Sequence, residues 1–213
     1  MSSGPVTAKG AATSRRILDA AAVEFAEQGI AGARIDRITA AARTNKAQVY
    51  GYFGNKDGLF DAVIADRADQ LMSAVAFDAD DLPGSAVAMY DANLRDPRLV
   101  RLLTWLRLER QPTGSLGRAV DHEPKLAAIA RAQAAGRVRP GDPFDLFTLV
   151  LSMAFAWSAA SIGYAATADE PDEHHERRRR LLAGCVRDAV SPGTAPPDRP
   201  GHPGSLISGP SSS

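Results

Sequence analysis

A break of about three residues between two helical stretches constrains this chain more than any other feature. Ile35, Ile38 and Ala42 fall on one face of a helix, and helical spacing resumes from Lys46 to Phe53. So short a connection holds the two helices rigidly crossed. This arrangement is that of a helix-turn-helix, whose second helix enters the major groove of DNA. An ordinary helical hairpin inside an all-α core gives the same local pattern and stays an alternative.

The rest of the chain also shows helical periodicity, without an alternating strand pattern of useful length. Ile17 and Phe25 lie on one face of a first helix that Thr13 or Ser14 can cap and Gly29 can end. We therefore predict an all-α protein of about nine helices, since strand patterns are missing. The helices beyond the break are expected at residues 56–77, 84–95, 98–110, 122–136, 143–166 and 173–190.

The short helix after the break carries side chains that need a partner. Val49 and Phe53 face inward, which turns Lys46, Ala47 and Tyr50 outward. Tyrosine hydroxyls can donate to phosphate while their rings pack on sugar. Asn45 is placed to cap the helix, whose free N–H groups then form a weak anion site. We expect a nucleic-acid backbone against this surface.

Charge and composition agree with a folded DNA-binding protein. The 213 residues are 45% apolar with zero formal net charge, but residues 1–60 hold eight Lys/Arg against five Asp/Glu, leaving 17 against 20 in the remainder. The broken helix therefore lies in the part of the chain with a net positive charge. This is the sign of charge that binding to a phosphate backbone requires. The single Cys185 excludes an internal disulfide and a CxxC metal or redox motif, and favours a reducing compartment.

Two sequence features bear on localisation. The N-terminus has no apolar stretch of the length a secretory signal needs, so the chain is expected to stay in the cytoplasm. Residues 146–168 carry no charge and have the length of a membrane span. Serine and threonine interrupt them and no second such segment exists, so we predict a buried helix and no membrane partner.

The segment from Arg15 to Ile64 resembles the N-terminal DNA-binding domain of the TetR family of one-component transcriptional regulators. The matching residues are Ile17-Leu18-x-Ala20-Ala21 with Phe25 and Gly29, Ile38 with Ala42, Val49-Tyr50-x-Tyr52-Phe53, and Asn55-Lys56-Asp57-x-Leu59. The resemblance implies a homodimer of all-helical subunits that binds a double-stranded DNA operator. It also implies a small molecule in the C-terminal domain that releases the operator, which makes the protein most simply a repressor of transcription.

Carried over residue by residue, the resemblance places ten residues at the DNA surface. They are Arg34, Arg43, Thr44, Asn45, Lys46, Ala47, Gln48, Tyr50, Tyr52 and Lys56. Gln48 is expected at a base edge and Lys56 at a phosphate. The chain departs from the family pattern where Arg43 replaces a turn glycine, Thr44 replaces an aliphatic residue, and Ala33-Arg34 replaces the usual Thr or Ser cap.

The predicted organisation has four parts. They are a disordered arm at residues 1–12, the helix-turn-helix domain at 13–60, a helical effector-binding and dimerisation domain at 61–190, and a disordered tail at 191–213. The tail consists mainly of Pro, Gly and Ser and offers little to bury.

A dimer interface is expected on the last two helices. The predicted 143–166 helix is apolar on all sides and must be buried on all sides, which a subunit of this size could hardly achieve alone. Its small-residue strip and one face of the last helix form the expected interface; an intrachain core is the alternative. The residues are Ala154, Ser158, Ser161, Ala165, Leu182, Cys185, Val186 and Ala189.

An effector pocket is expected between helices of the C-terminal domain. Pockets of this kind are mainly apolar, with a few polar groups. The candidates on that description are Met89, Tyr90, Trp105, Phe147, Met153, Phe155 and Trp157. Few ionisable residues fall in the apolar segments, which favours an apolar or uncharged effector.

Other function classes have weaker support. We expect no metal, because the adjacent His174 and His175 point about 100° apart on a helix, and no cofactor; both histidines and the run Arg177–Arg180 are read as solvated surface. No GxSxG, phosphate-binding glycine loop or HExxH occurs, so an all-α enzyme is a remote alternative. A helix-turn-helix protein without a small-molecule effector is the nearer one.

Overall fold

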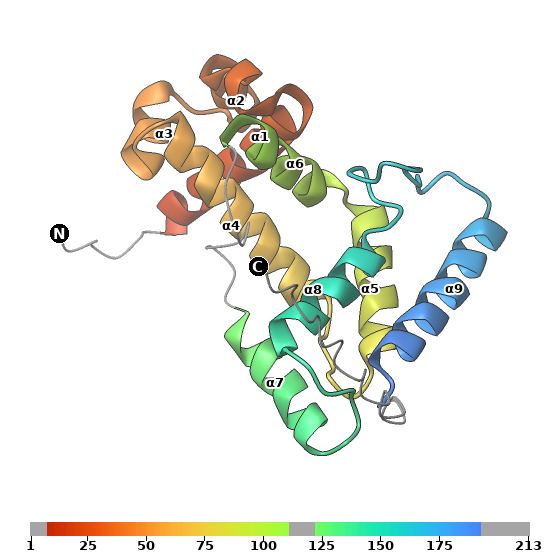
Figure 1. Ribbon diagram of the computed structural model, residues 1–213. Helices are drawn as coiled ribbons and strands as arrows, with labels where there is room; N and C mark the ends of the chain where they lie inside the picture. The colour runs from red at the N-terminus through yellow and green to blue at the C-terminus, as the bar shows by residue number, and fades with distance from the viewer. Residues whose placement is uncertain (1–7, 111–121, 193–213) are drawn as a thin grey trace, which may run out of the picture.

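The computed structural model describes residues 8–110 and 122–192, which form helices and no strand (Figure 1). The all-α prediction is confirmed. The helices are α1 (Ala8–Gly32), α2 (Ile35–Ala42), α3 (Lys46–Phe53), α4 (Lys56–Ala74), α5 (Leu82–Arg95), α6 (Arg98–Arg110), α7 (Glu123–Ala134), α8 (Pro143–Ala154) and α9 (Asp172–Val190).

The helices build two hydrophobic cores joined by α4. We call residues 8–64 the head and residues 65–192 the C-terminal domain. The head core holds Phe25 and Phe60 edge to face at 5.1 Å, with Ile38, Val49 and Leu102 of α6 fully buried beside them. The second core gathers side chains from α5, α7, α8 and α9. In Figure 1 the head lies at the top, and α4 descends from it into the C-terminal domain.

The first helix differs from the prediction at both ends. It begins at Ala8 instead of Thr13 or Ser14, so part of the expected arm is helical, and the Thr13 hydroxyl donates to the Lys9 carbonyl at 3.0 Å within the helix. Gly29 breaks the helix at φ 72° and ψ −179° without ending it, because a further turn continues to Gly32. The rest of the arm and nearly all of the expected tail lie outside the described residues.

The predicted helix 143–166 is wrong in its second half. α8 ends at Ala154, and turns follow as far as α9. Ser158 and Ser161 accept hydrogen bonds from the N–H groups of Ala160 and Tyr164, and such local side-chain bonds compete with a helix. The expected strip at helical spacing therefore does not exist, and the segment is not buried on all sides, since Leu149 is 48% exposed.

Four residues of the predicted dimer interface lie inside the subunit. Ala154, Leu182 and Val186 belong to the second core, and Ser158 is 2% exposed. A second copy of the chain cannot reach them, so the intrachain alternative is correct for these four. Ala165 and Cys185 are exposed, and Ser161 and Ala189 are partly exposed.

The prediction that the α9 charges and histidines are solvated is wrong in part. His175 and Arg178 are buried, on the face of α9 that also buries Leu182. Within the described residues no helix is long and apolar enough to cross a membrane.

Candidate nucleic-acid interface

The turn between α2 and α3 is built by a left-handed residue. Arg43 adopts φ 51° and ψ 54°, and the Thr44 N–H donates to the Thr39 carbonyl at 3.0 Å, which satisfies a carbonyl at the end of α2. A non-glycine residue in this conformation costs about 1 kcal/mol. The conformation is the one expected of the family's turn glycine, so Arg43 accommodates the same turn and extends its side chain into solvent.

Asn45 fixes the start of α3 as predicted. Its side-chain oxygen accepts a hydrogen bond from the Gln48 N–H at 2.9 Å. Val49 is fully buried and Phe53 half-buried, so one side of the short helix is anchored in the head core. α2, by contrast, has no side-chain cap at Arg34, whose N–H donates to the Glu24 carboxylate at 3.0 Å instead.

The opposite side of α3 is open. The exposed residues are Lys46, Ala47, Gln48, Tyr50, Gly51 and Tyr52, with Arg34, Arg43 and Asn45 exposed on the adjoining segments and Thr44 partly exposed. Tyr50 and Tyr52 are each 43% exposed, an unusual exposure for two aromatic side chains on so short a helix. Nine of the ten predicted DNA-binding residues are thus exposed or partly exposed, and eight of them follow one another in the turn and α3, while Arg34 precedes α2. Their contact with DNA stays a prediction.

Two polar side chains on this surface already have partners. Lys46 Nζ lies 2.9 Å from Asp36 of α2, and this hydrogen-bonded carboxylate raises the pKa of Lys46 above its ordinary value. Gln48 accepts a hydrogen bond from the Thr44 hydroxyl. Both contacts orient the side chains from within the motif, so the surface is partly organised in the absence of DNA.

Lys56, the tenth predicted residue, lies differently. Its ammonium donates to the carbonyls of Ala31 and Ala33 at 3.1 and 3.2 Å, at the end of α1. This cation therefore stabilises a helix C-terminus. A phosphate contact by Lys56 stays a prediction, and DNA would have to compete with these two carbonyls for it.

α6 connects the head to the C-terminal domain at the break in α1. The Glu109 carboxylate accepts hydrogen bonds from the N–H groups of Ile30 and Ala31 at 2.8 and 2.7 Å, and Trp105 Nε1 donates to the Ala26 carbonyl at 3.3 Å. Side chains of α6 thus hydrogen-bond the backbone on both sides of Gly29. We did not predict Glu109, because no local pattern reveals a cap that comes from a distant helix.

Ionic contacts link the same two regions through α4. Arg67 is 6% exposed and donates to Asp19 of α1, while Arg15 bonds both Asp19 and Asp66. Arg110 of α6 pairs with Asp57 and lies over the Phe60 ring at 5.0 Å. Arg67 occupies the helical face that also buries Val63 and Ile64, and a charged residue at such a position is a sequence signal for a buried pair.

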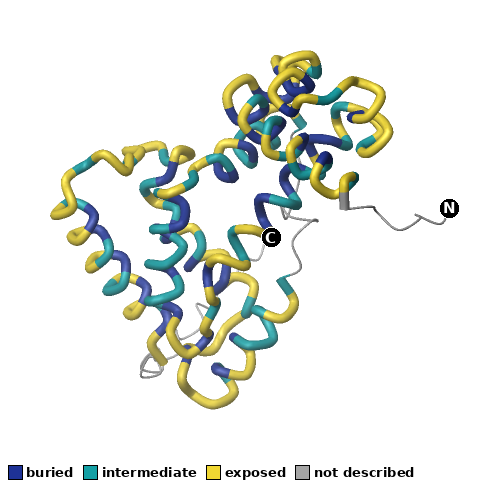
Figure 2. The backbone as a smooth tube through the Cα atoms, turned by 180° about the vertical axis from the view of Figure 1, so that it is seen from behind, coloured by how far each residue is buried: buried dark blue, intermediate teal, exposed yellow. Residues whose placement is uncertain are grey.

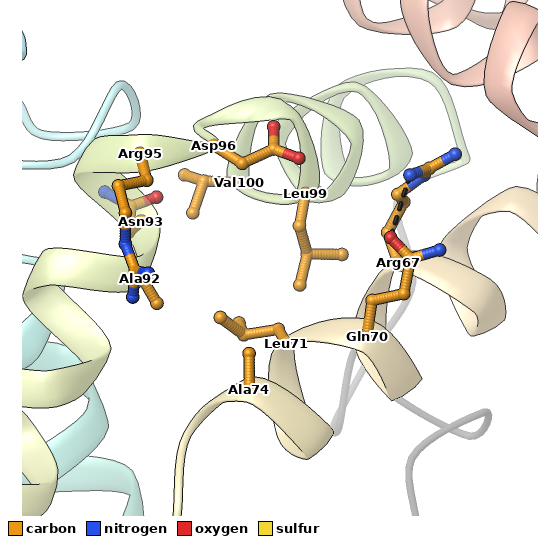
Figure 3. Close-up of a pocket in the computed structure, with 10 residues that line it drawn as sticks. All are labelled: Arg67, Gln70, Leu71, Ala74, Ala92, Asn93, Arg95, Asp96, Leu99 and Val100. Carbon is orange, nitrogen blue, oxygen red and sulfur yellow. Dashed lines mark hydrogen bonds between the residues drawn. The ribbon is translucent and has the colours of Figure 1, made fainter.

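A cavity of about 220 Å³ lies between α4, α5 and α6 (Figure 3). Its lining residues are Arg67, Gln70, Leu71, Ala74, Ala92, Asn93, Arg95, Asp96, Leu99 and Val100. None of the seven predicted pocket residues is among them. The lining carries more charge than the sequence suggested.

The predicted pocket residues have other places. Tyr90 and Phe147 are buried in the second core, Met89, Met153 and Trp157 pack against it, and Trp105 lies at the break in α1. Phe155 is partly buried at the end of α8. Trp157 also lines an open groove with Tyr164 and the start of α9.

A buried polar cluster ties α5 to α9. Tyr90 and His175 hydrogen-bond through the hydroxyl and Nδ1 at 2.7 Å, and His175 Nε2 has no hydrogen-bond partner among the described residues. Arg178 donates to Glu170 at 2.7 Å, and this bond lowers the pKa of Glu170 to about 2. The cluster holds the turns after α8 against the start of α9.

Two family models match this chain. Residues 81–188 match the family described as Tetracyclin repressor-like, C-terminal domain, and residues 17–63 match Bacterial regulatory proteins, tetR family. The HTH-type transcriptional repressor SCO4008 of Streptomyces coelicolor is 40% identical over 148 residues, which are 67% of this chain and 77% of that protein.

Solved structures share the fold. SCO4942 from Streptomyces coelicolor is 36% identical with a TM-score of 0.68, over 84% of this chain and 98% of that one. AibR, solved in complex with isovaleryl coenzyme A and operator DNA, is 20% identical with a TM-score of 0.57, over 82% of this chain and 97% of that one. At this identity AibR shows similarity of fold alone.

The helix-turn-helix head and the helical domain that carries it define a one-component DNA-binding regulator. The chain belongs to the TetR family of transcriptional regulators. Its family and its relatives are regulators, which removes the enzyme alternative.

Proposed function

We propose that this protein is a homodimeric repressor that binds a palindromic DNA operator through α3 and leaves it when a small molecule enters the C-terminal domain. The observation that carries the proposal is the exposed face of α3, anchored by Val49 and bearing Gln48, Tyr50 and Tyr52. Because operators are DNA, we place its action in the cytoplasm.

Base reading is assigned to Gln48 and backbone contact to the residues around it. A glutamine amide can pair with the major-groove edge of adenine. Tyr50 and Tyr52 suit phosphate and sugar, and Arg43, in the turn, suits phosphate. Arg43 makes no ion pair with any described residue, so its charge is available to DNA.

The dimer is proposed on the outer faces of α8, α9 and the turns between them. Five of the nine exposed large apolar side chains on the described residues lie there: Phe144, Leu149, Ile162, Tyr164 and Leu181. α9 lies along α5 at the outer edge of the domain, with its outer side exposed (Figure 2). These five side chains come from one stretch of the chain, 144–181, and large exposed apolar groups of this kind are typical of a protein interface.

Sedimentation tests the dimer. The wild-type chain is expected to sediment as a dimer at micromolar concentration, because two subunits would cover the apolar side chains. Leu181→Glu is expected to shift it toward monomer by placing a charge in the interface. Leu108→Glu is the matched control, since Leu108 is 63% exposed on α6 and Leu181 is 55% exposed. A monomeric wild type would contradict the proposal.

Operator binding is tested on duplexes selected from a random pool by the purified full chain. We expect recovery of a two-fold symmetric sequence, because a dimer presents two α3 helices. Recovery of no sequence, or of an asymmetric one, would contradict it. If no small molecule lowered the affinity for that operator, the alternative of a DNA-binding protein without an effector would hold. The cavity beside Arg67 argues against this alternative.

A further inference from the structure

The cavity between α4, α5 and α6 has an apolar centre and polar ends. Leu71, Leu99 and Val100 point toward its middle, while Arg67 and Gln70 stand at one end and Arg95 with Asn93 at the other (Figure 3). Its volume of about 220 Å³ is below the usual range for drug-sized ligands. A ligand that fits must therefore be small, with an apolar body.

The charges around this cavity do not balance. Asp96 is neutralised by Arg98, which donates to it at 2.6 and 2.7 Å and lies outside the lining. Arg95 donates to the Asp91 carbonyl and forms no ion pair with any described residue. Arg95 is exposed, so its guanidinium adds an unpaired positive charge at the open edge of the cavity and can attract an anion toward it.

Two buried polar atoms of the lining also have no hydrogen-bond partner in the described chain. Arg67 Nε is 3.5 Å from the Asp66 carboxylate without a hydrogen bond, and Asn93 Oδ1 is unpaired. Arg67 and Asn93 are 6% and 7% exposed. Buried donors and acceptors normally have a partner. A carboxylate in the cavity can accept from the Arg67 Nε–H, whereas the Asn93 oxygen, itself an acceptor, gains nothing from an anion.

Arg67 connects this cavity to the head. It lines the cavity, and its other edge donates to Asp19 of α1. Asp19 would keep a partner if Arg67 moved, because Arg15 donates to it at 3.0 Å. Turning Arg67 toward the cavity would therefore break a contact between α4 and α1 without isolating a carboxylate.

We infer that the cavity binds a small organic anion with an apolar body, and that the anionic group competes with Asp19 for Arg67. This inference rests on the proposed function as a ligand-released repressor and names the chemical class of its effector. It replaces the expectation of an apolar or uncharged effector. A ligand shifts a conformational equilibrium only by its difference in affinity between the two states. Here the two states are Arg67 bonded to Asp19 and Arg67 turned toward the cavity. The anion binds the second state more tightly, because only there does the guanidinium face it.

Binding is tested by calorimetry on the full chain with hexanoate, octanoate and benzoate. Hexanamide, octanamide and benzamide are matched uncharged probes of nearly the same shape. At least one acid is expected to bind about tenfold more tightly than its amide, a ratio within the usual range of charge-assisted contacts. Arg95→Gln removes a positive charge at the end of the cavity opposite Arg67 and should reduce the preference without abolishing it, whereas Arg131→Gln, an exposed arginine on α7, should leave it unchanged. Absence of binding by every acid, or equal binding of acid and amide, would overturn the inference.

The link through Arg67 is tested with Asp19→Asn, because replacing the buried Arg67 itself risks unfolding. Removing the competing charge should tighten acid binding by about fivefold, at the low end of common coupling factors. It should also reduce the effect of the acid on affinity for the selected operator. A merely structural role for Asp19 would lower stability and leave acid affinity unchanged, and that result would overturn the link.

The two proposals fail separately. Calorimetry needs no DNA, so acid binding is measured even if no operator is found. A chain that selects an operator but ignores the acids would retain the proposed function and lose this inference. A chain that binds the acids but selects no DNA would lose the proposed function.

Discussion

The caps of α3 and α4 in the head and the buried pair between α5 and α9 in the C-terminal domain satisfy polar groups over very different distances along the chain. In the head, Asn45 and Asn55 each accept a hydrogen bond from the N–H group three residues later. In the C-terminal domain the bond between Tyr90 and His175 spans 85 residues. The starts of α3 and α4 therefore depend on local caps, as do those of α5 and α8, whereas the contact of α5 with α9 depends on a pair that forms only after these helices have assembled.

The break at Gly29 is held by contacts from the distant helix α6 and offers the largest expected effect. Gly29→Ala would place a methyl group 2.4 Å from Glu109 Oε1 and 2.9 Å from the Trp105 ring. The backbone at φ 72° and ψ −179° is essentially reserved for glycine and alone costs an alanine about 1–3 kcal/mol, and displacement of Glu109 from two N–H groups adds to the loss.

Urea unfolding of Gly29→Ala measures this cost, with Gly51→Ala as control. Gly51 lies within α3 and has no neighbouring atom within 4 Å of an added methyl group. Alanine there should be neutral or stabilising by up to about 1 kcal/mol, because it favours helix. Equal effects of the two substitutions would show that the α6 contact at the break contributes nothing.

Tyr90→Phe probes the long-range pair of the C-terminal domain. It removes the only hydrogen bond that the buried His175 ring makes with the described residues, and leaves Nδ1 unpaired beside the unpaired Nε2. The free energy of unfolding should fall by about 1–3 kcal/mol. Tyr52→Phe, on the exposed face of α3, should change it by less than about 0.5 kcal/mol. Equal losses in the two variants would contradict the account.

The ion pair between Glu170 and Arg178 predicts a pH dependence. Hydrogen bonding to Arg178 lowers the pKa of Glu170 to about 2, below the value of about 4.3 for an unfolded chain. The pair therefore stabilises the fold above that unfolded value, and the contribution is lost as pH falls toward 2. Glu170→Gln should lose more stability at pH 7 than at pH 3, whereas Glu173→Gln, an exposed neighbour, should show no such difference. A constant loss would contradict the assignment.

The local caps give the smallest expected effect. Asn45→Ala and Asn55→Ala should each lower the free energy of unfolding by about 1 kcal/mol, because each removes one acceptor at a helix start. Urea titration of both variants checks the number. If either variant lost as much free energy of unfolding as Gly29→Ala, the cap would stabilise parts of the head beyond the helix that it begins.

The features that could be predicted from the sequence are those that depend on local contacts, and the features that could not depend on contacts between distant segments. Val49, the Asn45 cap and the uncapped start of α2 could be predicted because each depends on neighbours within a few residues. The end of α8 could not, since apolar periodicity continues while Ser158 and Ser161 bond their own backbone. The cavity depends on three helices, whose relative placement no single periodic pattern reveals.

Some missed residues did leave a signal. Arg67 lies between Ile64 and Leu71 at three- and four-residue spacing, and Arg178 lies four residues before the buried Leu182. His175 lies three residues before Arg178 on the same face. A charged or polar residue at such a position indicates a buried partner. Its identity could not be predicted, because Asp19, Tyr90 and Glu170 come from other segments.

The central claim is that the exposed face of α3 reads DNA, and a salt titration of Gln48→Ala on the selected operator tests it most directly. Base-pair variants within each half-site are measured beside it, with Arg43→Gln as the comparison. Gln48→Ala should relax preference at one base pair of each half-site by about 1–3 kcal/mol with little change in salt dependence. Arg43→Gln should weaken all sequences alike and reduce the salt slope by about one per subunit contact. Wild-type discrimination by Gln48→Ala would contradict the claim.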